Sequence, residues 1–248
     1  MRHDMRTDLL DAILNHAHPA VTYVHPILDL RTGAVMAKEV LTRFRDEAGQ
    51  MRTVGSILED TTVPPERRVQ LDLVCLAAIF ETLAEHPITD HLLFLNVSPL
   101  TLAYEDLWTR LNAWAWHLAI PPHRIVLEIT ENQSLHGLDA LASYVDELRR
   151  REFRIAVDDV GSGVASLSHV ARLRPDFIKM DQGLVRRVHQ RPYQQALLEA
   201  LAGFAHRMNM GFIAEGIETT EEMETLRAIG VPWGQGFLFG EPAPLSLP

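Results

Sequence analysis

Cysteine, lysine and long apolar runs are all scarce in this sequence. The single cysteine, Cys75, excludes an internal disulfide and suits a reducing cytosol. No apolar run reaches the about 18 residues that a membrane span needs. The N-terminal stretch MRHDMRTDLLDAILNHAHPA also lacks the apolar segment of a secretion signal. We therefore expect a cytoplasmic protein that does not insert into a membrane.

The chain also lacks any run of basic residues. Lys and Arg together number 23 against 33 Asp and Glu, so the formal net charge is −10. This balance argues against a nucleic-acid polymer as a partner. A small anionic ligand would need metal ions or a local cationic pocket. Only two of the basic residues are lysines, Lys38 and Lys179. Either Lys179 marks a position that needs a compact ammonium, or the choice is chance.

The sequence does contain a regular alternation of short apolar runs and helical patterns. Of its 248 residues, 47% are hydrophobic, which is enough for a large core. The runs that predict strands are VTYVHPILDL (21–30), AVMAKEVLTRF (34–44), LLFLNV (92–97), RIVLEI (124–129), RIAVDD (154–159), DFIKMD (176–181), GFIAEGI (211–217) and GQGFLF (234–239). Helical patterns lie between most of them, and TTEEMETLRAIG opens with a Thr/Glu capping signature.

Eight short apolar strands alternating with helices predict an α/β fold, a (β/α)8 TIM-like barrel. A doubly wound open sheet is the alternative, but no G-x-G-x-x-G turn follows the first strand. Only RTG joins the first two runs, so we expect an antiparallel first strand pair. The predicted domains are a short helical lead at 1–19 and the barrel at 20–248. In LNAWAWHL, Trp114 and Trp116 cannot share a helix face, so one should be core and one surface.

Polar residues recur where the predicted strands end. They are Glu39, Asn96, Glu128, Asp158, Asp159, Lys179, Asp181, Glu215 and, at the start of the last run, Gln235. In a barrel the carboxyl ends of the strands ring one mouth, where barrel enzymes place their sites. Each residue alone is weak evidence, because a strand Glu can be an edge residue and an Asn a turn former. Their regular recurrence predicts a common centre.

Two adjacent acids, Asp158 and Asp159, stand between an apolar strand and the glycines of GSG. Neighbours in a regular strand point to opposite faces, so these acids could share a site only if the backbone turns there. An N-cap or an acidic turn is the plainer interpretation of such a pair. If the two carboxylates do converge, their mutual repulsion calls for a cation.

The predicted donors are oxygen atoms, which favour Mg²⁺, Mn²⁺ or Ca²⁺. The twelve histidines show no ligand spacing, and we interpret most as ordinary surface or core residues. Two divalent ions bridged by a carboxylate are a common solution for phosphodiester cleavage. Asp158 could bridge both ions and Asp159 could bind one. Lys179 could orient the attacking water or stabilise charge on phosphorus.

The chain resembles the EAL-domain family of cyclic di-GMP phosphodiesterases over residues 20–244. The matching segments, in order, are KEVLTRF, FLNVSP, LEITE, VDDVGSG, FIKMD, AEGIET and GQGFLF. The resemblance implies a (β/α)8 barrel with an antiparallel first pair. It implies hydrolysis of cyclic di-GMP to linear pGpG with two Mg²⁺ or Mn²⁺ ions, with Ca²⁺ expected to inhibit. It also implies a homodimer.

The resemblance implies a role for each matching residue. Those implied as metal ligands are Glu39, Asn96, Glu128, Asp158, Asp159 and Glu215. Lys179 and Gln235 would position the nucleophilic water, and Glu39 and Glu215 would also belong to the catalytic set. Arg43, Gln235 and Asp181 would contact the substrate. Glu131 and Glu218 would support the site, one steadying the loop after Asp159 and the other lying near the lysine.

The chain departs from the family pattern at three places. The family's Y-Q-P is Val24-His25-Pro26 here, two aromatics of the loop after the aspartates are Val160 and Val164, and a usual basic residue is Glu241. These changes leave an alternative open: a weakly active or inactive EAL-like domain that acts as a cyclic di-GMP receptor or a protein-interaction module. The intact set of acids, lysine and glutamine favours the enzyme.

Overall fold

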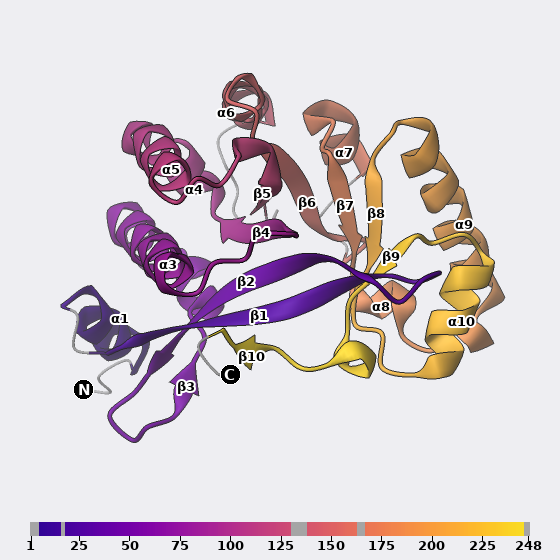
Figure 1. Cartoon of the computed structure of the whole chain (residues 1–248), viewed down its shortest axis with the longest axis horizontal. Helices are drawn as coiled ribbons and strands as arrows, with labels where there is room; N and C mark the ends of the chain where they lie inside the picture. The colour runs from indigo at the N-terminus through magenta and orange to yellow at the C-terminus, as the bar shows by residue number, and fades with distance from the viewer. Residues whose placement is uncertain (1–4, 16–17, 130–137, 163–166, 246–248) are drawn as a thin grey trace.

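The strands of this chain form one continuous hydrogen-bonded sheet. The computed structural model describes residues 5–15, 18–129, 138–162 and 167–245. The strands are β1 (Ala20–Asp29), β2 (Val35–Arg45), β3 (Met51–Arg52), β4 (Leu92–Val97), β5 (Ile125–Ile129), β6 (Arg154–Val160), β7 (Phe177–Met180), β8 (Gly211–Ala214), β9 (Trp233–Gly234) and β10 (Ala243–Pro244). Figure 1 shows β1 and β2 as a long ribbon beside the shorter strands.

The helices lie mainly between consecutive strands, as the sequence pattern predicts. They are α1 (Met5–Leu14), α2 (Gly55–Leu58), α3 (Pro65–Glu85), α4 (Pro99–Leu102), α5 (Glu105–His117), α6 (Leu138–Arg150), α7 (Leu167–Leu173), α8 (Gln182–Val185), α9 (Pro192–Arg207) and α10 (Thr220–Ala228), with 3₁₀ turns η1 (Pro122–Arg124), η2 (Val188–Gln190) and η3 (Phe237–Phe239). The predicted capping box at the start of α10 is confirmed, since Thr219 and Glu222 each bond the other's backbone N–H.

The sheet closes into a barrel of eight strands, which confirms the predicted fold. The parallel neighbours run in the order β2, β4, β5, β6, β7, β8 and β9. β1 completes the circle by pairing antiparallel with both β2 and β9, so it is the one reversed strand of the barrel. The tight turn after β1 is held by Asp29, whose side chain accepts from the N–H groups of Arg31 and Thr32. The predicted antiparallel first pair is therefore confirmed.

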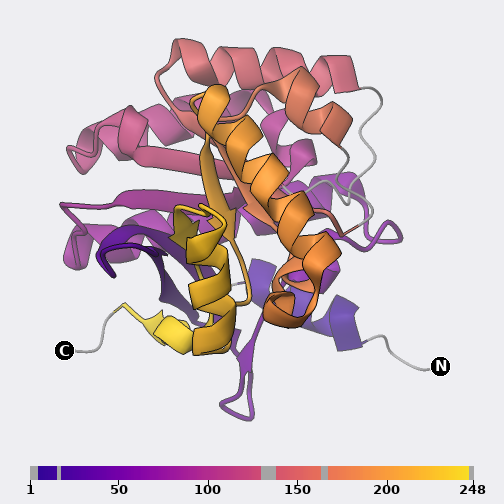
Figure 2. The same ribbon diagram turned by 90° about the vertical axis from the view of Figure 1, so that its right-hand side faces the viewer.

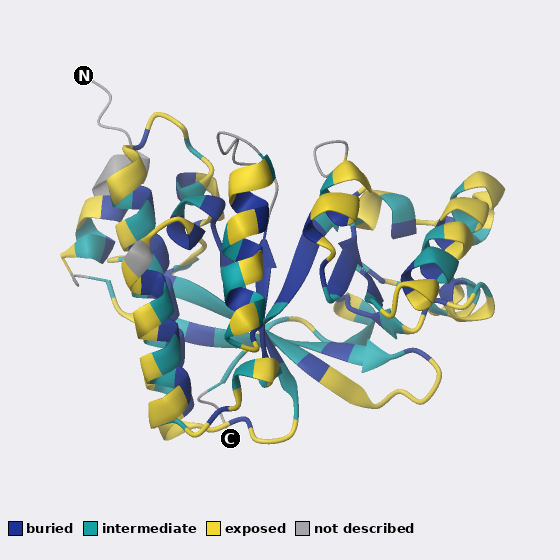
Figure 3. Ribbon diagram, turned by 90° about the horizontal axis from the view of Figure 1, so that it is seen from above, coloured by how far each residue is buried: buried dark blue, intermediate teal, exposed yellow. Residues whose placement is uncertain are grey.

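The core has two layers, because most barrel strands are buried on both faces. Aliphatic and aromatic side chains fill the barrel interior, among them Ile27, Ala37, Phe94 and Phe177. A larger apolar layer lies between the strands and the surrounding helices. Figure 2 shows α9 crossing the outside of the barrel, where its buried residues pack with those of β8. In Figure 3 these helices expose their outer faces and bury their inner ones.

The N-terminal helix α1 packs on the barrel through a separate apolar cluster. Leu10 and Ile13 of α1 are each 1% exposed and join Phe44 of β2 and Leu71 and Cys75 of α3. Figure 1 shows α1 beside α3 at one end of the β1–β2 ribbon. No helix within the described ranges is both long enough and apolar enough to cross a bilayer.

The prediction that 234–239 forms a strand is wrong. β9 ends at Gly234, Gln235 follows it, and 237–239 is a 3₁₀ turn. After Gly234 the chain bonds to the segment that follows β8, because Ile217 donates to the Gln235 carbonyl and Leu238 donates to the Ile217 carbonyl. Gly236 permits this approach, since a Cβ there would lie 2.2 Å from the Ile217 oxygen. Gln235 therefore sits on a tight turn at the barrel mouth.

The two tryptophans of α5 differ as expected, and they provide a matched test of the packing. Trp114 packs against the core and stacks on Phe80 with ring centres 4.8 Å apart, whereas Trp116 is 88% exposed. We expect Trp114→Ala to lower the free energy of unfolding by about 2–3 kcal/mol. Trp116→Ala should change it by less than about 0.5 kcal/mol. Urea unfolding measures both, and equal losses would contradict this assignment of the two faces.

Candidate active site

The polar residues predicted at the strand ends meet at one mouth of the barrel. Their centre is the side chain of Lys179 on β7, which is 1% exposed. Its ammonium lies 2.8 Å from Glu215, 3.0 Å from Glu128 and 3.3 Å from Asp158, with Glu39 at 3.9 Å. Acids from four different strand ends therefore surround one buried cation.

Burial and charge together set the proton affinities around Lys179. Burial opposes the charged form of Lys179, but the surrounding carboxylates outweigh it and raise its pKa well above the ordinary value. Burial raises the pKa of Glu128 well above its usual range, and Lys179 offsets this only in part. Burial also opposes ionisation of Glu39, yet Lys179 and hydrogen bonds from Gln235 and Asn96 lower the pKa of that carboxyl. The lysine is thus charged, with an ionised Glu39 nearby.

The adjacent aspartates do converge, and the backbone of β6 explains how. The pairing of β6 with β7 shifts register between Val157 and Val160. Within that irregularity Asp159 has a φ of 55°, in the left-handed region. The ligand atoms of Asp158, Asp159 and Glu215 consequently lie within 4.8 Å of one another. The turn that the sequence analysis required is present.

The environment of Asp159 disfavours its ionised form while no cation is bound. Burial raises the pKa of Asp159 to about 6, and the nearby charges of Asp158 and Asp181 add to the shift. A site of this kind gains free energy when a divalent ion neutralises it, because its carboxylates then lose their mutual repulsion.

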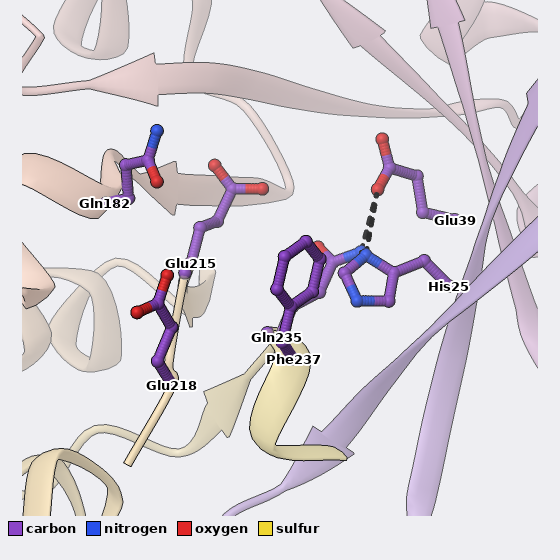
Figure 4. A pocket seen from close by; sticks show the side chains of 9 residues that line it. His25, Glu39, Gln182, Glu215, Glu218, Gln235 and Phe237 are labelled. Atoms are coloured by element: carbon purple, nitrogen blue, oxygen red, sulfur yellow. Dashed lines mark hydrogen bonds and ion pairs between the residues drawn. The ribbon is translucent and has the colours of Figure 1, made fainter. Parts of the chain in front are cut away.

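A second group of contacts holds Glu39 from two sides, because Asn96 lies on the neighbouring strand β4 and Gln235 lies on the turn after β9. Asn96 donates to Glu39 Oε1 at 3.1 Å, and Gln235 donates to Glu39 Oε2 at 2.7 Å. The same Gln235 nitrogen lies 2.8 Å from Nδ1 of His25. His25, Glu39 and Gln235 line a cavity of about 140 Å³ together with Phe237 and Glu215 (Figure 4).

The sequence analysis missed His25 and Phe237 as members of this site. His25 appeared there only as a departure from the family pattern. The signal that was available is the alternation along β1, because Ile27 faces the barrel interior and His25 lies two residues further toward the mouth. Phe237, which is 59% exposed, had no such signal because it follows the turn at Gln235.

The remaining predicted residues lie at several places around the mouth. Arg43 stacks over the ring of Tyr23, 4.4 Å from its centre, and lines a second cavity of about 310 Å³ that reaches Asn96. Asp181 caps α8 by accepting from the Gly183 N–H at 2.9 Å. Glu218 is exposed and lines the smaller cavity beside Glu215.

Four further residues were singled out in the sequence. Glu131 and Val164 lie outside the described residues. Val160 is buried in the apolar layer and Glu241 is exposed. The first replaced aromatic position is therefore a core position in this chain.

The comparison with protein families matches the EAL-domain model to residues 6–242. This chain belongs to the EAL-domain family. Among curated relatives, the probable cyclic di-GMP phosphodiesterase PdeA of Escherichia coli (strain K12) is 30% identical over 214 residues. That match covers 84% of this chain and 28% of PdeA, so the chain spans well under a third of that relative.

Solved structures of EAL proteins share the fold. BlrP1 of Klebsiella pneumoniae, solved as a manganese/cy-diGMP complex, is 27% identical with a TM-score of 0.81. The match covers 92% of this chain and 57% of BlrP1. A standalone EAL protein from Vibrio cholerae O395, in its c-di-GMP-bound form, is 25% identical with a TM-score of 0.81. The match covers 93% of this EAL chain and 95% of the Vibrio cholerae protein.

The two lysines of this EAL chain provide a matched test of the central cation. Without metal, Lys179→Met leaves the surrounding acids with no cationic partner, so we expect a loss of about 3–5 kcal/mol in stability at pH 8. The loss should be smaller at pH 5, because protonated carboxyls need no counter-charge. Lys38→Met at a half-buried position should change stability by less than about 0.5 kcal/mol. Urea unfolding in EDTA measures the stability of both variants, and similar midpoints for the two would contradict a central role of the Lys179 charge.

The raised pKa of Asp159 predicts a pH dependence of stability in the metal-free protein. Between about pH 4 and 6 the folded chain keeps a proton on Asp159 that the unfolded chain has lost. Stability from this group is therefore full below pH 4 and is lost as pH rises through 6. We expect Asp159→Asn to gain stability relative to the parent over that window and to hold the gain above it.

Asp46 provides a control of opposite sign. Hydrogen bonds from Arg52 and from the Gln50 backbone lower the pKa of this half-buried carboxyl. Asp46→Asn should therefore be less stable than the parent above about pH 4, and this deficit should shrink as pH falls below about 4. Thermal unfolding in EDTA from pH 3 to 8 measures both series, and a flat difference for Asp159→Asn would refute its raised pKa.

Proposed function

We propose that this chain is a metal-dependent phosphodiesterase that hydrolyses cyclic di-GMP to linear pGpG. The observation that carries the proposal is the convergence of Asp158, Asp159 and Glu215 beside a fully buried lysine. Membership of the EAL family supports it, as do the relative named a probable cyclic di-GMP phosphodiesterase and the c-di-GMP-bound structures of relatives.

The residues of the mouth fit a pair of hard divalent cations, Mg²⁺ or Mn²⁺. The donors are oxygen atoms, and the Glu128 carboxylate is fully buried: its Oε1 faces the Lys179 ammonium at 3.0 Å, whereas its Oε2 has no hydrogen-bond donor among the described residues. Buried acceptors of this kind are costly unless a cation or a donor meets them. The proposed metal ligands are Glu39, Asn96, Glu128, Asp158, Asp159 and Glu215. Bound ions would supply a water of lowered pKa and charge stabilisation at the phosphoryl group.

The side chains of the chain itself place the reactants. In the proposed reaction a water oxygen adds to phosphorus, one P–O ester bond of the ring breaks, and the departing oxygen takes a proton. Lys179 keeps its proton and so provides a fixed positive charge near the phosphorus. Gln235 is held by Glu39 and can accept a hydrogen bond from the attacking water. Glu39 and Glu215 complete this catalytic set.

The substrate would reach a mouth that is acidic overall. Arg43 provides a cationic group on the same face of β2 as Glu39, since it lies four positions further along the strand, an even number. We propose that Arg43 contacts a phosphate or a base of the substrate. Asp181, at the N-cap of α8, is the other proposed contact. The proposed support from Glu218 agrees with its place on the rim of the smaller cavity.

Four expectations from the sequence stay predictions. They are a cyclic di-GMP receptor as the alternative function, a homodimer, a cytoplasmic location and inhibition by Ca²⁺. The departures at His25, Val160 and Glu241 are the reason to keep the receptor alternative in the design of the test.

Incubation of the purified chain with cyclic di-GMP and Mn²⁺, with and without EDTA, tests the proposal. We expect pGpG only with metal, and a loss of at least about 100-fold in turnover for Glu39→Gln and Lys179→Met. Glu199→Gln on the exposed face of α9 is the matched control and should keep full activity. Chromatography of the products measures turnover by the parent chain and by the three variants.

Two results would overturn the proposal. Intact dinucleotide together with tight binding in a titration would identify a receptor. Full activity of Glu39→Gln or Lys179→Met would place the chemistry elsewhere in the molecule.

A further inference from the structure

The amide of Gln235 makes two contacts through a single nitrogen. Its Nε2 lies 2.7 Å from Glu39 Oε2 and 2.8 Å from His25 Nδ1. An amide nitrogen has two hydrogens and no lone pair to accept with, so it donates in both contacts. His25 Nδ1 is therefore an acceptor, and the proton of the neutral imidazole is on Nε2. Backbone groups of Gly236 and Gly240 lie near this ring, and Nε2 itself is buried with no hydrogen-bond partner among the described residues.

The opposite orientation of the amide is excluded by the contact with Glu39. Rotating it by 180° would bring its carbonyl oxygen beside the ionised Glu39 carboxylate, two acceptors in contact, even though the other tautomer of His25 could then donate to that oxygen. His25 and Glu39 thus both bind the Nε2 atom of the amide, and neither of them binds its oxygen, Oε1. That oxygen is buried and accepts no hydrogen bond from the described residues. In Figure 4 it lies on the side of the amide away from His25.

The barrel positions His25 for this contact through its one reversed strand. His25 lies directly across from Glu39 in the antiparallel pairing of β1 with β2. Gln235 arrives from the turn after β9, which pairs with the other side of β1. The side chain of His25 is 12% exposed, so its ring has little freedom to leave the amide. The β1–β2 hairpin and the distant turn after β9 therefore fix one carbonyl oxygen together.

We propose that His25 is a positioning residue for hydrolysis at this site, because it holds the Gln235 amide with its carbonyl oxygen directed to the attacking water. This inference rests on the proposed function. His25 touches neither water nor substrate in this role, and it acts through Gln235. Glu39 alone would leave the amide one hydrogen bond and free to swing about it.

The first test is spectroscopic and needs no turnover. Long-range ¹H–¹⁵N NMR of the metal-free protein at pH 7.5 reports which imidazole nitrogen carries the proton, and the spectrum of His25→Asn assigns the His25 ring by its loss. We expect the Nε2–H form. An Nδ1–H form or a doubly protonated ring would overturn the inference, whatever the protein does to cyclic di-GMP.

The second test compares two variants of His25 in steady-state kinetics with cyclic di-GMP and Mn²⁺. In His25→Asn the Oδ1 atom can replace Nδ1 as the acceptor, so kcat should stay within about 3-fold of the parent. His25→Leu removes the acceptor, so kcat should fall by about 10- to 100-fold with KM nearly unchanged. Thermal unfolding checks that both variants are folded.

Combination with a Gln235 variant separates positioning from a general structural role. In a Gln235→Ala background His25→Leu should have no further effect on kcat, because the group it positions is gone. Equal kcat for His25→Leu and the parent, or additive losses in the double variant, would overturn the inference. If the parent itself makes no pGpG, the proposed function fails and the NMR result still decides the orientation of the amide.

Discussion

The site depends on one buried ammonium that several carboxylates share. Lys179 could not be placed in a barrel interior alone, and Glu128 could not be buried without it, because each isolated charge would lose its hydration. The closed barrel makes the arrangement possible, since neighbouring parallel strands deliver their last residues to the same mouth. The apolar layers below and around the mouth hold these strand ends in place and exclude water from the charges.

Two departures from regular geometry shape this mouth. The left-handed residue Asp159 interrupts β6 and turns a second carboxylate toward the first. The reversed strand β1 brings an imidazole to a position across from Glu39. A uniform parallel barrel would present residues at regular intervals only. The irregular segments are therefore the ones that crowd acids, an amide and an imidazole into a small volume.

The sequence predicted the barrel and most of the mouth because both follow from local patterns. Each apolar run and the RTG turn can be recognised from a short segment of sequence alone. The polar residues at the ends of those runs can then be assigned to the mouth of the barrel. The contact between His25 and Gln235 could not be predicted this way, because it depends on how β1 closes against β9. The wrong strand at 234–239 has a similar cause: hydrogen bonds to Ile217 redirect a run that is apolar in composition. The capping role of Asp181 depended on where α8 begins, which strand spacing does not fix.

The closure of the barrel through β1 also constrains how the chain can fold. The bond between Gln235 and His25 joins residues 210 positions apart, and that between Gln235 and Glu39 spans 196. During synthesis the first strand is made long before its partner β9, so one of its edges has no strand to pair with until nearly the whole domain has left the ribosome. Contacts of such long range slow folding and leave strand edges open to other chains in the meantime. The pairing that completes the site thus has to wait for the end of the chain, and until then this edge of the nascent protein is open to misassembly.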